Sequence, residues 1–414
     1  MNDFESVYVA RQPVFDRQQK VWGYELLFRS SGDAATADVW DDSLATSRVI
    51  ADGVTLALPG IGMGQKALIN FPESLLLSGS AYALPSDVCV VEILETARPT
   101  PEVLGELEKL RQEGFTLAMD DFTGEEELLP FLNYVDILKV DILALGSDPE
   151  RIREALARVE GRGLTLLAEK VEDQEVFHLC AELGFDLFQG FFFSRPEVIP
   201  GKKISTNEAA KLQLLRELSQ PDFEFSHLAE IIRLDPSLSY RLFRYVNSAA
   251  QGFARKVESV DRALTLLGQN QASQWLRAVI LSDINPAPRA REVSFLSLQR
   301  ARFLWLLCGE TDICLRSPDA LFTLGLFSLL DTLMAMPMAD ILVELPLDEE
   351  VSRTLLGEAT ELTDLLRLVR SFEAGSFEAM ERYAARYDLD LAALDSMYSE
   401  SMVWVLGALQ READ

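Results

Sequence analysis

Short apolar runs recur along the first part of the chain, and polar segments separate them. Each run is four to eight or so residues long and rich in β-branched and aromatic types, as is typical of buried strands. They predict eight strands: Val7–Arg11, Val21–Phe28, Lys66–Asn70, Val88–Leu94, Phe115–Asp120, Ile137–Val140, Leu164–Ala168 and Leu187–Gln189.

Helical periodicity appears between several of these strands. Pro101–Glu113 and Pro149–Arg162 both carry apolar residues every three or four positions, which predicts amphipathic helices. Alternating strands and helices predict an α/β fold, and eight strands favour a TIM-like (β/α) barrel. Periodicity does not reveal whether a sheet closes, so a doubly wound open sheet also fits this pattern.

The pattern changes after Val198–Lys203, where Pro200 and Gly201 interrupt both helix and strand and predict a linker. From there to the C-terminus the apolar positions, mostly leucine, follow a helical period. We therefore predict an α/β domain over residues 1–200 and an all-helical domain over residues 201–414. A chain of 414 residues also suits two hydrophobic cores better than one.

The charge balance narrows the possible partners. The chain has 38 Lys and Arg against 66 Asp and Glu, a formal net charge of −28, and no basic cluster. Such a surface repels a nucleic-acid polymer, and an anionic ligand would need a bridging cation. The sequence shows neither a secretory signal nor an apolar run that could span a bilayer. Four cysteines without CxxC spacing predict reduced thiols, so we expect a cytoplasmic protein without membrane contact.

Carboxylates, amides and one lysine fall repeatedly near the ends of the predicted strands. A barrel gathers the carboxyl ends of its strands into one mouth, where several acids repel each other unless a cation holds them. Oxygen ligands favour Mg²⁺ or Mn²⁺ over zinc, and adjacent aspartates could bridge two ions. Any single carboxylate of this kind could instead cap a helix or lie in solvent. The positions are Glu25, Asn70, Glu92, Glu95, Asp120, Asp121, Lys139, Glu169, Glu172 and Gln189.

The segment GYELLFR (Gly23–Arg29) resembles the signature of EAL domains, bacterial enzymes that hydrolyse cyclic di-GMP. Further motifs of that family follow in order along the same part of the chain. Gln12-Pro13 resembles the QP pair, Asn70 the metal-binding asparagine, Glu92–Glu95 ExTE, Asp120–Phe122 DDF, Leu138–Asp141 LKID, Ala168–Glu172 AEGVE and Gln189–Phe191 QGY.

The resemblance implies a role for each of these residues. Glu25, Asn70, Glu92 and Asp120 would hold one metal ion, and Asp121 would help to hold a second. Lys139 and Glu169 would position or activate the attacking water. Gln12, Arg29 and Gln189 would contact cyclic di-GMP, while Glu95 and Glu172 would brace the loops around the metals.

Three positions depart from the family pattern. Leu26 replaces the alanine of the EAL triplet and places a larger side chain beside Glu25. Leu94 replaces the threonine of ExTE, and Lys170 replaces the glycine of AEGVE. The metal residues are thus complete, whereas their surroundings are altered.

The second half resembles an HDOD domain through Leu228–Ala250, Val260–Gly268 and Trp275. The resemblance implies a module that binds an as yet unidentified protein partner. An HD-type metal site needs several histidines, and the whole chain has only His178 and His227. The domain order resembles that of EAL-HDOD proteins, and a homodimer is expected by analogy.

Three functions remain open at this point. The chain could be a phosphodiesterase that converts cyclic di-GMP to pGpG. It could be a receptor or scaffold that binds cyclic di-GMP without turnover and signals through the HDOD domain. It could also be an interaction protein that needs no nucleotide.

Overall fold

The computed structural model describes residues 7–30, 61–62, 64–194, 257, 259–285, 288–311, 313, 316–343, 345 and 347–409, and single positions between 214 and 246. The chain forms two compact units. The first comprises Met1–Arg195, Arg370–Ala385 and Asp390–Ser396, and the second comprises the remainder. The predicted linker at Val198–Lys203 lies outside the described residues, so the domain boundary near residue 200 stays a prediction.

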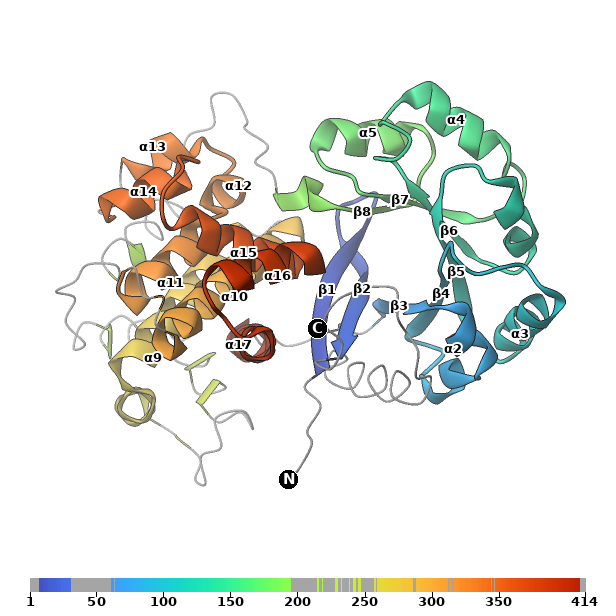
Figure 1. Ribbon diagram of the computed structural model, residues 1–414. Helices are drawn as coiled ribbons and strands as arrows, with labels where there is room; N and C mark the ends of the chain where they lie inside the picture. Colours follow the sequence, from blue (N-terminus) through green and yellow to red (C-terminus); the bar gives the residue numbers. More distant parts are fainter. Residues whose placement is uncertain are drawn as a thin grey trace. The chain divides into compact units, whose positions relative to one another are not determined.

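The first unit contains a closed eight-stranded barrel, in the order β1 to β8 (Figure 1). The α/β barrel prediction is therefore confirmed, and closure removes the open-sheet alternative. Helices and 3₁₀ turns connect the strands: α2 (Glu73–Leu77), η2 (Ser80–Ala83), α3 (Pro101–Gln112), η3 (Glu126–Asn133), α4 (Pro149–Ala157), α5 (Gln174–Glu182) and η4 (Phe191–Ser194). The strands are β1 (Val7–Asp16), β2 (Val21–Ser30), β3 (Lys66–Phe71), β4 (Cys89–Ile93), β5 (Thr116–Phe122), β6 (Ile137–Asp141), β7 (Thr165–Glu169) and β8 (Leu187–Gln189).

The first strand runs against all the others. β1 pairs antiparallel with both β2 and β8, whereas each pair of neighbouring strands from β2 to β8 is parallel. A tight turn causes this reversal: Asp16 accepts hydrogen bonds from the backbone of Gln18 and Lys20, and Gln19 has a φ of 56°. A parallel pair would need a crossover of a dozen or more residues, which this turn cannot supply.

A layer of apolar side chains fills the barrel below its mouth. Because strand side chains alternate between faces, every second residue points inward. The inward layer is formed by one residue from each of seven strands, and Trp22 packs against it: Val14, Leu68, Val90, Ala118, Ile137, Leu167 and Leu187. This apolar layer fills the barrel interior beneath the next inward position of each strand.

Gly190 follows β8 where the chain passes very close to another backbone segment. Its φ is +139°, and a Cβ there would lie 2.2 Å from the carbonyl oxygen of Val171 and 2.4 Å from its nitrogen. Val171 cannot withdraw easily, because its N–H donates to Gln189 O and its carbonyl accepts from Phe192 N.

We expect Gly190→Ala to destabilise the protein by about 3 kcal/mol, since it adds an overpacked contact to a strained backbone. Gly161→Ala is the matched control, because Gly161 also has a positive φ (+78°) but a Cβ added there would have nothing within 4 Å. That control should cost about 1–2 kcal/mol. Urea unfolding measures both, and equal losses for the two variants would refute the close-contact argument.

The C-terminal half is helical in its described residues, as predicted. Its helices are α9 (Val260–Ser282), α10 (Pro288–Glu310), α11 (Pro318–Phe327), α12 (Leu330–Met334), α13 (Met338–Leu342), α14 (Glu349–Leu355), α15 (Thr363–Glu373), α16 (Phe377–Arg386) and α17 (Leu391–Leu409). Trp275, Phe303 and Phe322 are fully buried within it. No helix in the described part of the chain combines the length and apolarity needed to cross a membrane.

The cysteines agree only partly with the prediction of reduced thiols. Cys89 and Cys180 are free and buried. Cys308 is disulfide-bonded, so the prediction is wrong for this residue. Cys314 lies outside the described residues. Motif spacing alone does not decide whether a cysteine pairs, because a disulfide also requires suitable Cα and Cβ geometry.

Candidate metal centre at the barrel mouth

The polar residues of the mouth form the layer directly above the apolar layer of the barrel. In six strands the mouth residue stands two positions after a residue of the apolar layer and therefore shares its inward face. In β1, which runs the opposite way, Gln12 stands two positions before Val14. The six pairs are Leu68/Asn70, Val90/Glu92, Ala118/Asp120, Ile137/Lys139, Leu167/Glu169 and Leu187/Gln189.

The Lys139 ammonium lies at the centre of this polar layer. It is 1% exposed and contacts carboxylates from four other strands. The Nζ–oxygen distances are 2.8 Å to Asp120 and to Glu169 and 3.4 Å to Glu25, and Lys139 also contacts Glu92. If all four acids are ionised, one ammonium leaves a formal charge of −3, which favours a further cation.

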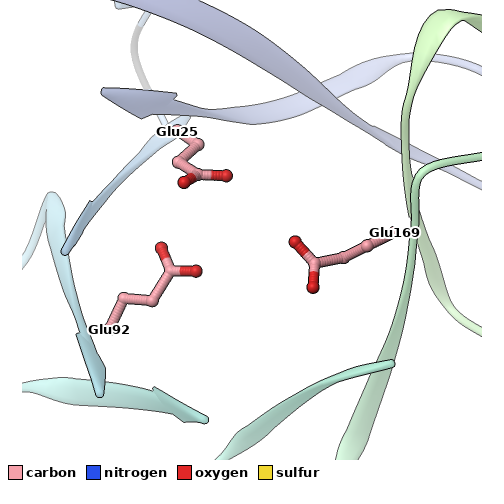
Figure 2. A group of neighbouring side chains, drawn as sticks. All are labelled: Glu25, Glu92 and Glu169. Carbon is pink, nitrogen blue, oxygen red and sulfur yellow. The ribbon is translucent and has the colours of Figure 1, made fainter. Parts of the chain in front are cut away.

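Three of these carboxylates face one another across the mouth (Figure 2). Glu25, Glu92 and Glu169 each have a carboxylate oxygen within 4.8 Å of the other two. They come from β2, β4 and β7, which are not neighbours in the barrel. Only the closed ring of strands brings them together.

Amide side chains orient the Glu25 carboxylate. Asn70 Nδ2 donates to Glu25 Oε1 at 2.9 Å, and Gln189 Nε2 donates to Glu25 Oε2 at 2.6 Å. Gln189 Nε2 also contacts Gln12 Oε1 at 3.0 Å. The antiparallel register places Gln12 opposite Glu25, which explains how a residue in the middle of β1 reaches the mouth.

Burial and charge act differently on the acids of the mouth. Burial raises the pKa of Glu25, but Lys139, Gln189 and Asn70 outweigh it, so the pKa is lowered overall. Burial raises the pKa of Asp120 well above its usual range, and the neighbouring Glu169 and Glu25 add to this rise. Burial likewise raises the pKa of Glu169 in spite of Lys139. The protein alone therefore does not balance the charge of these acids.

Several buried acceptors in the mouth have no hydrogen-bond donor among the described residues. These atoms are Asn70 Oδ1, Glu92 Oε2, Glu169 Oε2 and Gln189 Oε1. Buried oxygens are normally satisfied, and a bound ion or an ordered water would satisfy these. A set of carboxylate and amide oxygens without histidine or thiol is the donor chemistry of Mg²⁺ and Mn²⁺. The residues present thus fit a divalent cation.

A second group of acids lies at the outer edge of the mouth. Glu95, Asp120 and Asp121 each have a carboxylate oxygen within 4.8 Å of the others. Lys170 Nζ lies 2.9 Å from Asp121 Oδ1 and 2.5 Å from Asp141 Oδ2. Asp141 ends β6 and is not among the predicted site residues. Its position two residues after Lys139 in the same strand places it on the inward face and is the signal for it in the sequence.

The other predicted positions lie around this centre. Glu172 is exposed in the loop between β7 and α5. Arg29 belongs to β2, but its side chain lies outside the described residues. Leu26 is fully buried, and strand alternation puts its larger side chain on the opposite face of β2 from Glu25. Leu94 is half-buried directly after β4.

No group of three or more metal ligands occurs in the described residues of the helical half, since both groups found lie in the barrel. His178 is on the exposed side of α5 in the first unit. His227 lies outside the described residues.

Comparison with known proteins agrees with this architecture. The EAL domain model matches residues 57–196 and the HDOD domain model matches residues 206–359. YuxH of Bacillus subtilis is 34% identical over 405 residues, which is 96% of this chain and 98% of YuxH. The cyclic di-GMP phosphodiesterase CdgJ of Vibrio cholerae is 34% identical over 402 residues, 96% of this chain and 92% of CdgJ.

A solved structure of Klebsiella pneumoniae BlrP1, in complex with manganese and cyclic di-GMP, is 27% identical in sequence to this chain. The match covers 47% of this chain and 57% of the BlrP1 chain, with a TM-score of 0.39. The two full-length relatives, together with the two domain matches, show the family. This chain belongs to the EAL-HDOD proteins, in which an EAL domain precedes an HDOD domain.

Proposed function

We propose that this chain is a divalent-metal-dependent phosphodiesterase that hydrolyses cyclic di-GMP to pGpG, with Mg²⁺ or Mn²⁺ as its cofactor. One observation carries the proposal: Glu25, Glu92, Asp120 and Glu169 surround one mouth in which buried carboxylate and amide oxygens have no donor among the described residues. The full-length similarity to CdgJ, a protein named as a cyclic di-GMP phosphodiesterase, supports the choice of substrate.

The acidity of the chain also favours a metal. A cyclic dinucleotide carries phosphodiester charges, and a mouth lined by carboxylates repels it. A divalent cation bound by Glu25, Asn70, Glu92 and Asp120 would neutralise this charge, stabilise the phosphorane-like transition state and lower the pKa of the attacking water.

Glu169 and Lys139 have different roles in the proposed reaction. Glu169 Oε2 has no donor among the described residues and can accept the proton of the attacking water. Its other oxygen is held by Lys139 Nζ at 2.8 Å, which fixes the direction of the carboxylate. The water oxygen forms a bond to phosphorus, the P–O3′ bond breaks, and the leaving 3′ oxygen takes up a proton to give linear pGpG.

Chromatography of the reaction products tests this function. The purified full-length chain, incubated with cyclic di-GMP and Mg²⁺ or Mn²⁺, should form pGpG, and chelation of the metal should stop the reaction. Glu25→Ala should abolish product formation, whereas Glu108→Gln, an exposed change on α3, should leave it unchanged. Absence of pGpG from the wild-type chain with either metal would refute the proposed activity.

A receptor without turnover is the second candidate, and one observation favours it. The Lys170 ammonium forms an ion pair with Asp121. The family resemblance assigns the Asp121 carboxylate to a second metal. In that case cyclic di-GMP would bind in the mouth, and the HDOD domain would pass the signal to a protein partner. Calorimetric binding of cyclic di-GMP without pGpG formation would select this candidate. In either case we propose a cytoplasmic protein, with a homodimer as its expected assembly.

A further inference from the structure

Lys170 is the most unusual residue of the mouth. It follows β7 directly and has a left-handed backbone, with a φ of 56°. Its ammonium contacts two carboxylates from other strands, Asp121 from β5 and Asp141 from β6. The three strand ends are thereby joined by a single cationic side chain.

This cluster is held in place from both sides. Asp141 is 7% exposed, and its Oδ1 accepts a hydrogen bond from Ala144 N at 2.8 Å while Oδ2 binds Lys170. Asp121 also has a left-handed backbone, with a φ of 48°. Non-glycine residues adopt this conformation at a cost, so the surrounding structure fixes the backbone at both positions.

We propose that the Lys170 ammonium acts as a tethered cation at Asp121 and Asp141, takes the place of a second divalent ion and makes this mouth a centre for one ion. The inference rests on the proposed metal-dependent function and specifies the number of ions. Lys170 is a specificity-determining residue in this proposal, because it selects the metal content of the mouth.

Electrostatics explains why the Lys170 ammonium competes with a second ion at Asp121. An ion bound to Glu95, Asp120 and Asp121 would lie against the Asp121 carboxylate that Lys170 already contacts at 2.9 Å. A divalent ion and an ammonium at such a separation repel strongly, even in a partly exposed site. The ammonium is covalently tied to the chain and cannot diffuse away, so the second ion binds more weakly.

The other ion position is unaffected by Lys170. Glu25 and Glu92, two of the proposed ligands of that ion, belong to the buried group of carboxylates, and the contacts of the Lys170 ammonium are with Asp121 and Asp141 instead. We therefore expect one ion to bind normally. The charge that Lys170 supplies at Asp121 is single and fixed, whereas a second metal would supply a double charge and a bound water.

Counting Mn²⁺ on the full-length chain tests this proposal without an activity assay. Equilibrium dialysis gives the number of ions per chain, and electron paramagnetic resonance shows whether they interact. Two ions about 3.5–4 Å apart are magnetically coupled, whereas one ion keeps its resolved hyperfine pattern. The variants are Lys170→Gly, which also suits the left-handed backbone, Lys170→Arg, which keeps the charge, and Lys20→Gln, an exposed control in the β1–β2 turn.

The wild-type chain, Lys170→Arg and Lys20→Gln should each bind one uncoupled Mn²⁺. Lys170→Gly should bind two coupled ions, the second at least about tenfold more tightly than in the wild type. Two coupled ions in the wild type, or one ion in Lys170→Gly, would overturn the inference and leave the phosphodiesterase proposal standing. No bound Mn²⁺ in any variant would overturn both, and one ion without pGpG formation would overturn only the phosphodiesterase.

Discussion

Glu169→Gln is expected to slow the hydrolysis of cyclic di-GMP by about 10²–10⁴-fold, the range typical of a lost general base. The amide has nearly the shape of the carboxylate but cannot accept the proton of the attacking water. Glu169 lies at the end of β7 with Oε1 on Lys139, so the variant keeps the position of the side chain. Timed chromatography of pGpG measures the rate.

Measuring the binding of cyclic di-GMP shows whether Glu169→Gln has lost only the chemical step or has also lost the structure of the site. Calorimetry in Ca²⁺, which is expected to support binding without turnover, should give cyclic di-GMP affinities for Glu169→Gln and the wild type within about threefold. Glu108→Gln serves again as the surface control and should match the wild type in both assays. Full activity of Glu169→Gln would remove this residue from the mechanism.

Lys139→Met is expected to destabilise the metal-free barrel by about 3–5 kcal/mol, because it leaves buried carboxylates without their central cation. Lys139 is 1% exposed and contacts four acids, three of which belong to the group facing one another in Figure 2. Hydrogen exchange of the β5–β7 amides in the presence of a chelator localises the loss to the barrel. Adding Mn²⁺ should recover part of it, since the ion restores positive charge to the mouth.

Lys109→Met is the matched control for this experiment. Lys109 pairs with Glu106 at 2.8 Å on the surface of α3, and its side chain is 66% exposed. A surface pair of this kind contributes about 1 kcal/mol or less. Equal stability losses in the two variants would contradict the central role of the Lys139 ammonium.

The strands of the barrel could be predicted closely from the sequence, and so could the helix α3 at Pro101–Gln112, but other connections could be predicted only in part. All eight predicted strands are present, because each is a short apolar run between polar segments. The helix predicted at Pro149–Arg162 ends at Ala157, however, and the chain then turns through Gly161 and Gly163, both with positive φ. Barrel closure and the reversed direction of β1 depend on pairing between segments that are distant in sequence. Local periodicity does not predict that pairing.

The candidate site was likewise predictable from the sequence only in part. The alternation of residues in strands puts Asn70, Glu92 and Glu169 above apolar inward positions, which is why a sequence pattern could find them. The partners of Lys170 were not predictable, since its ion pairs join the ends of three strands that are separate in sequence. The sequence shows that Lys170 replaces a glycine of the family motif, but only the tertiary structure shows which carboxylates Lys170 contacts.

Anomalous diffraction from crystals of the full-length chain soaked with Mn²⁺ and cyclic di-GMP tests the central claim most directly. We predict an anomalous peak in the barrel mouth at about 2.0–2.2 Å from oxygens of Glu25, Asn70, Glu92 and Asp120, with a phosphate of the nucleotide beside it. A mouth without an anomalous peak, in crystals where the four side chains are ordered, would contradict the account.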